Sequence, residues 1–112
     1  MPKDDRIYVG HMLDMARKVF GKTLTISRDQ FDVDENLRFA VTYLLQVIGE
    51  AASHVSSDFR DEHHQIPWKA IIEMRQKVVH DYMNVDEDIV WDTARSEVPS
   101  LVELLEAVFP PD

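Results

Sequence analysis

Apolar residues recur at helical spacing along most of the chain, and no stretch keeps up the alternation that is typical of a strand. The pattern predicts helices at about residues 4–20, 35–57 and 67–83, and a fourth helix that ends near residue 109. Together these segments predict an all-α fold with a single domain over residues 1–112. We expect an antiparallel up-and-down four-helix bundle with one longer connector.

Small and polar residues predict where the first two helices begin and end. Gly21 follows the first apolar run and is expected to stop that helix at its C′ position. In the polar connector that follows, Ser27 and either Asp32 or Asp34 can cap helices. Phe31 is the apolar residue of this connector, and we expect it to anchor the connector in the core.

The later helix ends carry similar signals. Pro67 suits the first position of the third helix, where a missing N–H costs nothing. Asn84 is expected to end that helix and to form a capping box with Glu87 for the fourth, with Asp86 as the rival cap. Apolar residues keep their helical phase on both sides of Pro99, which predicts a kink there rather than a break.

The second helix has two non-polar sides. Its main stripe is formed by Leu37, Ala40, Val41, Leu44, Leu45, Ile48, Ala51, Ala52 and Val55. The other side carries Phe39, Tyr43, Val47, Glu50 and His54. This second side could meet another helix of the bundle or a second subunit. We favour a homodimer, because a bundle of 112 residues has little core to spare.

The composition of the chain bears on its cellular location and on the partners it can bind. The chain contains no Cys, which fits a cytoplasmic location, and no apolar run is long enough for a membrane span. The charged N-terminus lacks the apolar segment of a signal peptide. The net charge of −9 argues against nucleic-acid binding through a broad basic surface, but leaves room for a small local basic cleft.

Arg75 falls within the apolar stripe of the third helix, where an unpaired guanidinium would be costly to bury. It therefore has a partner or faces a polar cleft. Glu50 is a candidate partner, and an exposed Glu50 at a dimer rim is the alternative. On an ideal helix His80 lies about 140° around from Arg75, and Tyr82 lies about 20° from it. A bend at the helix end, or a second chain, would have to bring His80 to Arg75.

The residues alone leave the chemistry open. Arg75, His80 and Tyr82 could equally be a structural arginine, a surface histidine and a core tyrosine. His63 and His64 lie in an expected loop away from any metal-binding motif, so we expect no metal site and no cofactor. The sequence also contains no glycine-rich phosphate loop and no nucleophile elbow.

Several segments together resemble a known family. Arg75, His80 and Tyr82 have the spacing of the Arg-x4-His-x-Tyr motif in the HepT-like branch of the HEPN superfamily. The similarity extends to Ile-Gly-Glu-Ala-Ala at 48–52 and Ile-Pro-Trp-Lys at 66–69, in the same order, and covers nearly the whole chain.

This resemblance implies a HEPN-type bundle that forms a homodimer. It implies a metal-independent endoribonuclease that cleaves RNA at a dimer-interface cleft and acts as the toxin of a type VII-like toxin–antitoxin pair. Arg75 and His80 would be catalytic. The antitoxin would be a nucleotidyltransferase of the MNT class, which transfers AMP to Tyr82.

Neighbouring residues would support this chemistry. Glu50, Gln76 and Lys77 are the candidates for orienting the catalytic groups or the substrate. Gln76 stands where the family often carries Asn or Asp. The competing hypothesis is a non-catalytic dimeric adaptor, or nucleotide-binding partner, of a nucleotidyltransferase, in which Arg75 and His80 are structural. The net charge of −9 supports that alternative.

Overall fold

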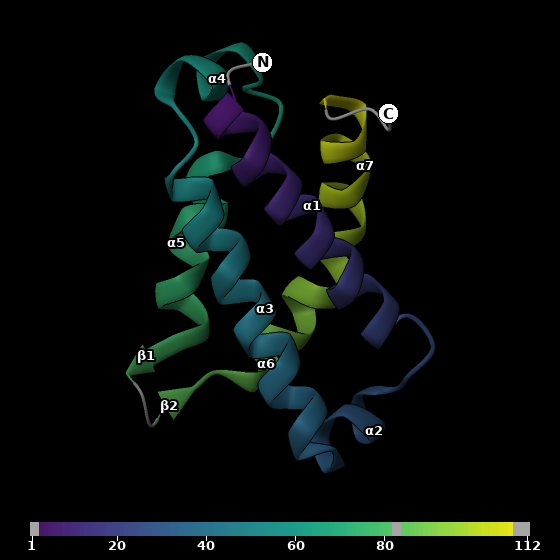
Figure 1. The fold of residues 1–112 in the computed structure, drawn as a ribbon. Coiled ribbons are helices and arrows are strands. Elements are labelled where there is room, and N and C mark those ends of the chain that lie inside the picture. The colour runs from purple at the N-terminus through teal and green to yellow at the C-terminus, as the bar shows by residue number, and fades with distance from the viewer. Residues whose placement is uncertain (1–2, 82–83, 109–112) are drawn as a thin grey trace.

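The structure of the protein is a computed structural model that describes residues 3–81 and 84–108 (Figure 1). The N-terminal half contains α1 (Lys3–Thr23), α2 (Arg28–Val33), α3 (Glu35–Ser53) and α4 (Ser57–Glu62). The C-terminal half contains α5 (Trp68–Val78), β1 (Val79–Asp81), β2 (Asn84–Val85), α6 (Glu87–Asp92), a π-helix at Thr93–Glu97, and α7 (Val98–Val108).

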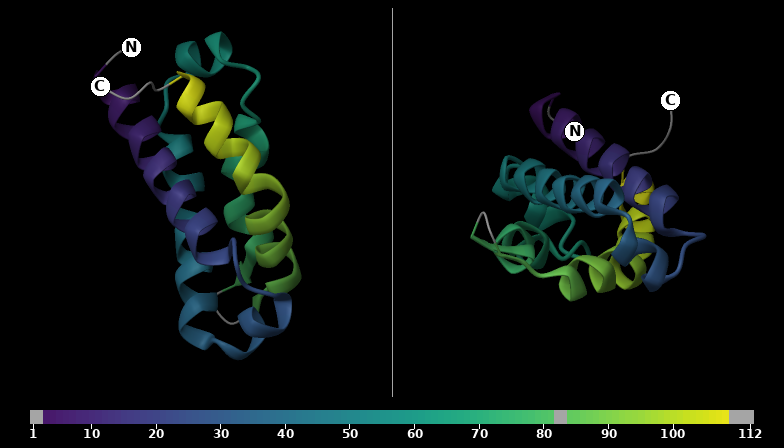
Figure 2. Two further views of the ribbon diagram at one scale, coloured as in Figure 1. Left: turned by 90° about the vertical axis from the view of Figure 1, so that its right-hand side faces the viewer. Right: turned by 90° about the horizontal axis from the view of Figure 1, so that it is seen from below.

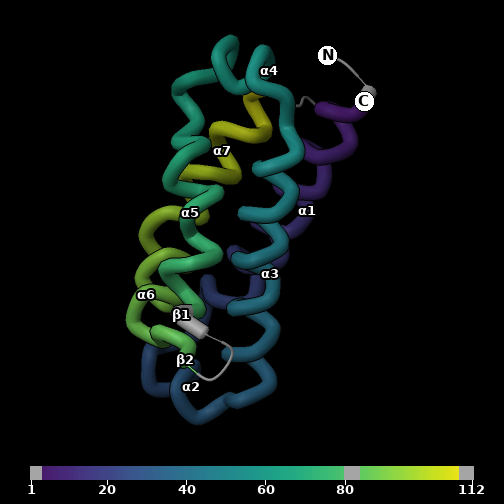
Figure 3. Tube along the Cα trace, turned by 90° about the vertical axis from the view of Figure 1, so that its left-hand side faces the viewer, coloured from purple at the N-terminus to yellow at the C-terminus, as the bar shows by residue number. Residues whose placement is uncertain are grey.

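The long helices run in alternating directions along the molecule, which agrees with the antiparallel order expected from the sequence (Figure 1). α1 packs against α3 and α7, and α3 packs on its other side against α5 (Figures 2 and 3). The expected all-α class is confirmed, with one local exception. β1 and β2 form a small antiparallel hairpin that the sequence did not predict. Within the described residues, no helix is long and apolar enough to cross a membrane.

One apolar core joins the helices. Most of the main stripe predicted for the second helix is buried, with Val41, Leu45, Ile48 and Ala52 fully inaccessible, while Leu37 and Ala40 are partly buried. Phe31 is also fully buried and anchors the connector as predicted. The large side chains that complete this core come from other segments: Met12, Val19, Ile66, Val78, Val90 and Leu105.

The first helix does not stop at Gly21. α1 continues to Thr23, and no described residue, glycine or not, has a positive φ. The C-terminal turn is closed instead by ordinary helical bonds, in which the Leu24 amide donates to the Phe20 carbonyl at 3.0 Å. Glycine is tolerated inside a helix as well as just beyond its end. The position of Gly21 alone therefore did not determine where α1 ends.

The connector is more ordered than expected, because it contains α2. Ser27 caps α2 in a capping box with Gln30, and Asp34 caps α3 by accepting from the Leu37 amide at 3.0 Å. Asp32, the alternative cap, instead accepts from Arg28 at 2.8 Å. The second helix ends at Ser53, earlier than predicted, and α4 then begins on its own cap.

The prediction that the third helix reaches residue 83 is wrong. α5 ends at Val78, and Val79 takes an extended φ of −129° as it enters β1. Pairing with β2 replaces the helical bonds there, and β-branched Val79 suits this strand. At the start of α5, Pro67 is the N-cap rather than the first helical residue.

The fourth helix is capped by Asp86, whose carboxylate accepts from the Ile89 amide at 3.1 Å. Asn84 lies in β2, so the predicted Asn84 cap is wrong and its rival is confirmed. The chain then stays helical across Pro99, as predicted. The irregularity is a π-helical turn just before it, in which the Val98 amide donates to the Thr93 carbonyl. Such a widened turn is one way to accommodate a residue that lacks an N–H donor.

Candidate active site

Arg75 has the partner that the sequence suggested. From α5 its Nη1 donates to Oε2 of Glu50 on α3, and this ion pair joins the two helices. The side chain of Arg75 is 38% exposed and that of Glu50 is 56% exposed. Because both groups still reach solvent, the pair can exchange with an incoming anion at little energetic cost.

Gly49 allows the arginine to lie this close to α3. A Cβ on Gly49 would stand 2.8 Å from Cγ of Arg75 and 2.9 Å from the backbone oxygen of Ile71. Such distances are too short for real carbon atoms, so any larger residue would push α3 and α5 apart or displace Arg75. The residue before Glu50 therefore fixes the distance between the two helices at the site.

The contact network continues from Glu50 toward α1. The other carboxylate oxygen, Oε1, lies 3.1 Å from Nε2 of His54, one helical turn along α3. The His54 ring stacks on Tyr8 of α1 with a centroid separation of 5.1 Å and an interplanar angle of 21°. The sequence placed Glu50 and His54 on one side of their helix, but it contained no signal for Tyr8. This contact joins residues far apart in the chain and depends on how α1 packs.

His80 lies in β1, two residues after α5 ends. The backbone turns out of the helix at Val79, so the expected helical angle between Arg75 and His80 no longer applies. The structure therefore contains a bend at the end of the third helix, one of the two arrangements that could bring His80 to Arg75, and the approach of the two side chains stays a prediction. The amide of Asp86 donates to the Val78 carbonyl at 2.8 Å and holds this turn against the start of α6. Tyr82 lies outside the described residues, and so the prediction that it lies beside Arg75 falls outside them too.

Gln76 and Lys77 are both exposed on α5. Lys77 borders a hollow of about 280 Å³ whose other walls include Ile89 of α6 and Thr93 of the π-helix. Glu50 and Arg75 do not line this hollow. The structure thus brings Glu50 to Arg75 but places Lys77 at a different surface.

The histidines make contacts of other kinds. His63 is the C-cap residue of α4, and its ring lies 4.3 Å from that of Phe59. His54 contacts Glu50 and Tyr8 as described above. Across residues 3–81 and 84–108 there is no group of three or more His, Asp or Glu side chains that could hold a metal ion.

Much of the second side of α3 is left exposed by the described residues, apart from His54 where it stacks on Tyr8. Phe39 and Tyr43 are 61% and 65% exposed, although both are large and apolar in character. Glu50 and His54 lie further along the same side and are also exposed. An exposed aromatic surface thus runs along α3 to the Arg75–Glu50 ion pair.

Comparison with known proteins agrees with the resemblance found in the sequence. Residues 12–108 match a family described as ribonuclease HepT-like. A protein of Thermococcus cleftensis named "Probable ribonuclease HepT" is 32% identical over 101 residues, which cover 90% of this chain and 92% of that protein. A Caldanaerobacter subterraneus protein named as a "Putative RNase" is 35% identical over 99 residues, 88% of each chain. No solved structure matches this chain significantly. This chain therefore belongs to the HepT-like ribonuclease family.

Proposed function

We propose that this protein is a metal-independent endoribonuclease with Arg75 and His80 as its catalytic residues. The observation that carries the proposal is the end of α5, within a chain of the HepT-like family. There a solvent-accessible arginine, held by Glu50, precedes a bend that releases His80 from the helix.

The proposed chemistry needs only these side chains and the RNA. The 2′ oxygen attacks the adjacent phosphorus, a new O–P bond forms, and the bond from phosphorus to the 5′ oxygen breaks. Negative charge builds on the non-bridging oxygens, to which Arg75 can donate two parallel hydrogen bonds. Imidazole can accept the 2′ proton or protonate the departing 5′ oxygen near neutral pH.

One imidazole cannot be in both protonation states at once, so the mechanism calls for two. A HEPN-type homodimer would supply the second His80 across a two-fold axis. The exposed Phe39 and Tyr43 of α3 support such an interface, because large aromatic side chains left in solvent are typical of interaction surfaces. The same surface leads to Arg75, so dimer formation would create the cleft around the catalytic groups.

We further propose that the enzyme is the toxin of a type VII-like toxin–antitoxin pair. Its partner would be an MNT-class nucleotidyltransferase that transfers AMP to Tyr82. The added phosphate would place a negative charge two residues from His80 and repel an RNA phosphate. Intact mass of the chain expressed with and without the partner tests this step. We expect a gain in whole AMP units that disappears in Tyr82→Phe.

The decisive test of the activity is RNA cleavage by the purified chain and by His80→Ala. We expect the variant to fold and to lose cleavage. His11→Ala is the control, because His11 is an exposed histidine of α1 outside the proposed catalytic pair, and it should keep cleavage. Retained cleavage in a folded His80→Ala protein would show that the assignment is wrong.

A second candidate function is a non-catalytic adaptor for a nucleotidyltransferase. The Arg75–Glu50 ion pair favours it, because an arginine already neutralised by a carboxylate can be purely structural. The two functions differ in one measurement. The adaptor would bind the nucleotidyltransferase but leave RNA intact at every protein concentration, whereas the ribonuclease would cleave RNA in the absence of the partner.

A further inference from the structure

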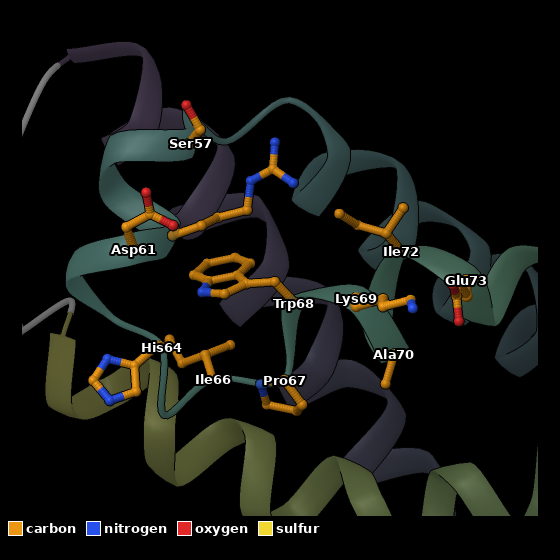
Figure 4. Close-up of a pocket in the computed structure, with 11 residues that line it drawn as sticks. Ser57, Asp61, His64, Ile66, Pro67, Trp68, Lys69, Ala70, Ile72 and Glu73 are labelled. Carbon is orange, nitrogen blue, oxygen red and sulfur yellow. The ribbon is translucent and has the colours of Figure 1, made fainter.

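A broad hollow lies where α4 leads into α5. It has a volume of about 920 Å³ and opens widely to solvent. Its apolar floor includes Pro67, Trp68 and Ile72, and its polar rim includes Arg60, His64 and Lys69. In Figure 4 the Trp68 ring lies between the His64 and Lys69 side chains, so apolar and basic groups border one surface.

Among the described residues, Arg60 and Lys69 on the rim of the hollow have no ion-pair partner. Arg60 is half-buried, and its Nε donates to the carbonyl of Val55 at 3.1 Å, just past the end of α3. Its terminal amino groups make no hydrogen bond or ion pair with any other described residue, and Lys69 makes none either. By contrast, Arg17, Arg28 and Arg38 each have a carboxylate within 4.0 Å. On a chain of net charge −9, two cations without such partners in one hollow are notable.

Two carboxylates also line the hollow, those of Asp61 and Glu73. Both residues are exposed, and neither lies within ion-pair distance of the basic groups. Their presence limits the affinity for a polyanion. The hollow therefore suits a small number of specific phosphate contacts rather than general attraction of nucleic acid.

The hollow adjoins the candidate active site. Lys69, Ile72 and Arg75 follow one another on successive turns of α5, and Nε of Arg75 lies 3.5 Å from the carbonyl of Ile72. At 1.5 Å and 100° per residue, Lys69 is about 9 Å along the helix from Arg75 and about 120° around it, with Ile72 between them at about 60° from each. An RNA strand that contacts both residues would therefore cross the helix at Ile72, which itself lines the hollow.

We propose that this hollow is a second RNA subsite, which binds the strand beside the phosphate that is cut. Arg60 and Lys69 each contact one flanking phosphate, and the apolar floor of Pro67 and Ile72 supports the ribose or base. The inference rests on the proposed ribonuclease function and adds substrate-binding residues outside the Arg-x4-His-x-Tyr motif.

The test compares two double variants of the full chain. Arg60→Gln with Lys69→Gln removes two positive charges from the hollow. Lys18→Gln with Lys22→Gln removes two from the exposed side of α1, far along the bundle (Figure 1). The probe is a single-stranded oligonucleotide with 2′-O-methyl groups throughout, because its blocked 2′ oxygens cannot attack. Binding is measured over a range of salt concentrations, and cleavage of ordinary RNA is measured in parallel.

We expect the hollow variant to bind on the order of tenfold more weakly at 0.1 M salt, with a salt slope smaller by roughly 1.4, as two lost phosphate contacts on a single strand predict. The α1 variant should match the wild type. In the cleavage assay the Arg60→Gln/Lys69→Gln variant should have a higher KM and an unchanged kcat. The difference in KM should vanish for a dinucleotide, which is too short to reach the hollow. Lys69→Gln alone keeps the bond between Arg60 and the Val55 carbonyl, so it controls for a folding defect caused by the loss of that bond. It should show about half of the change in salt slope.

The outcomes separate this inference from the proposed activity. If wild type cleaves RNA but the two double variants bind alike, the hollow is not a subsite while the ribonuclease stands. If the hollow variant changes only the affinity for the nucleotidyltransferase, the hollow binds that protein and the inference is wrong. Salt-dependent binding that Arg60 and Lys69 control, without any cleavage, would support the subsite and contradict the proposed catalysis. A wild-type chain that binds no RNA would overturn both.

Discussion

Gly49 of α3 lies directly against the side chain of Arg75 of α5, where an added Cβ on the glycine would lie 2.8 Å from Cγ of the arginine. The Ile71 carbonyl, 2.9 Å from the same point, cannot move without shifting α5. We expect Gly49→Ala to lower the free energy of unfolding by about 1–3 kcal/mol, the usual cost of overpacking. Chemical denaturation measures this change.

Gly21→Ala is the matched control. Gly21 also lies inside a helix, but a Cβ there would meet nothing within 4 Å. Alanine is the better helix former, so this variant should gain roughly 0.5–1 kcal/mol in the free energy of unfolding. If both glycine variants were stabilised alike, helix propensity would outweigh the contact, and Gly49 would not set the spacing of the site.

Glu50→Gln separates positioning from stability. Both side chains of the Glu50–Arg75 ion pair are partly exposed to solvent. The loss of this pair should therefore change the free energy of unfolding by less than about 1 kcal/mol. RNA cleavage should nevertheless fall about tenfold, because small displacements of an oriented catalytic group are costly. Glu106→Gln, which removes the exposed partner of Arg17, is the control and should leave cleavage unchanged. Unchanged cleavage in Glu50→Gln would mean that Glu50 does not position Arg75.

The sequence predicted most of the helical core because apolar spacing reports directly on burial. Phe31 and most of the main stripe of α3 are buried as expected, and the caps Ser27 and Asp34 lie where their side chains can satisfy free amides. The pairing of Glu50 with Arg75 was also predictable, since a charge within an apolar stripe requires a partner.

The errors occur where tertiary contacts override local preference. The segment after Val78 keeps a helical pattern, yet it leaves the helix because Val79 pairs with Val85 across the hairpin. Periodicity cannot reveal that competition. The stacking of His54 on Tyr8 is hidden for a similar reason, because it depends on the position of α1 against α3.

Asp5 should contribute strongly to stability. It is 3% exposed, and its two carboxylate oxygens accept from the amide and hydroxyl of Ser56 at 2.8 and 2.7 Å. These bonds tie the start of α1 to the cap of α4. Hydrogen bonds to a charged group contribute about 1.5–3 kcal/mol, so Asp5→Asn should lower the free energy of unfolding by that amount.

The adjacent Asp4 offers the control for Asp5. Asp4 is exposed, and Asp4→Asn should change the free energy of unfolding by no more than about 0.5 kcal/mol. A double-mutant cycle between Asp5→Asn and Ser56→Ala should also show coupling, because both changes alter the bond from the Ser56 hydroxyl to the Asp5 carboxylate, while the Ser56 amide is kept in both variants. Additive effects in that cycle would contradict a direct contribution of this contact.

Glu87 should make the protein less stable as pH rises. Burial raises the pKa of Glu87 above its ordinary 4.5, because the cost of desolvation outweighs the attraction of Arg38. Its Oε2 is buried without a hydrogen-bond partner among the described residues. The folded state therefore holds this proton more tightly than the unfolded state. Stability from this group is complete below pH 4.5 and is lost as pH rises through the higher folded pKa.

The Glu87→Gln variant tests the predicted direction of this pH dependence of stability. The variant should have a higher free energy of unfolding than wild type at neutral pH, and the difference should shrink as pH falls toward 4.5. Denaturation curves at several pH values measure it. Glu103→Gln, on the exposed side of α7, is the control and should show no such trend. A variant less stable than wild type at neutral pH would show that the interaction of Glu87 with Arg38 dominates instead.

The exposed aromatic surface of α3 predicts how the active protein assembles. Tyr43 is 65% exposed in the single chain, and an aspartate there would place an unpaired charge within the proposed dimer interface. We expect light scattering to give a dimer for wild type and a monomer for Tyr43→Asp. Cleavage should be lost with the dimer, because the monomer has only one His80.

Val33→Asp is the matched control for this interface. Val33 is 86% exposed, more than Tyr43, but it lies at the end of α2 rather than on the aromatic side of α3. It should therefore remain a dimer and keep its activity. If both aspartate variants stay dimeric, another surface forms the dimer. If Tyr43→Asp becomes monomeric yet cleaves RNA at the wild-type rate, one chain supplies both the acid and the base, and the two-histidine mechanism is wrong.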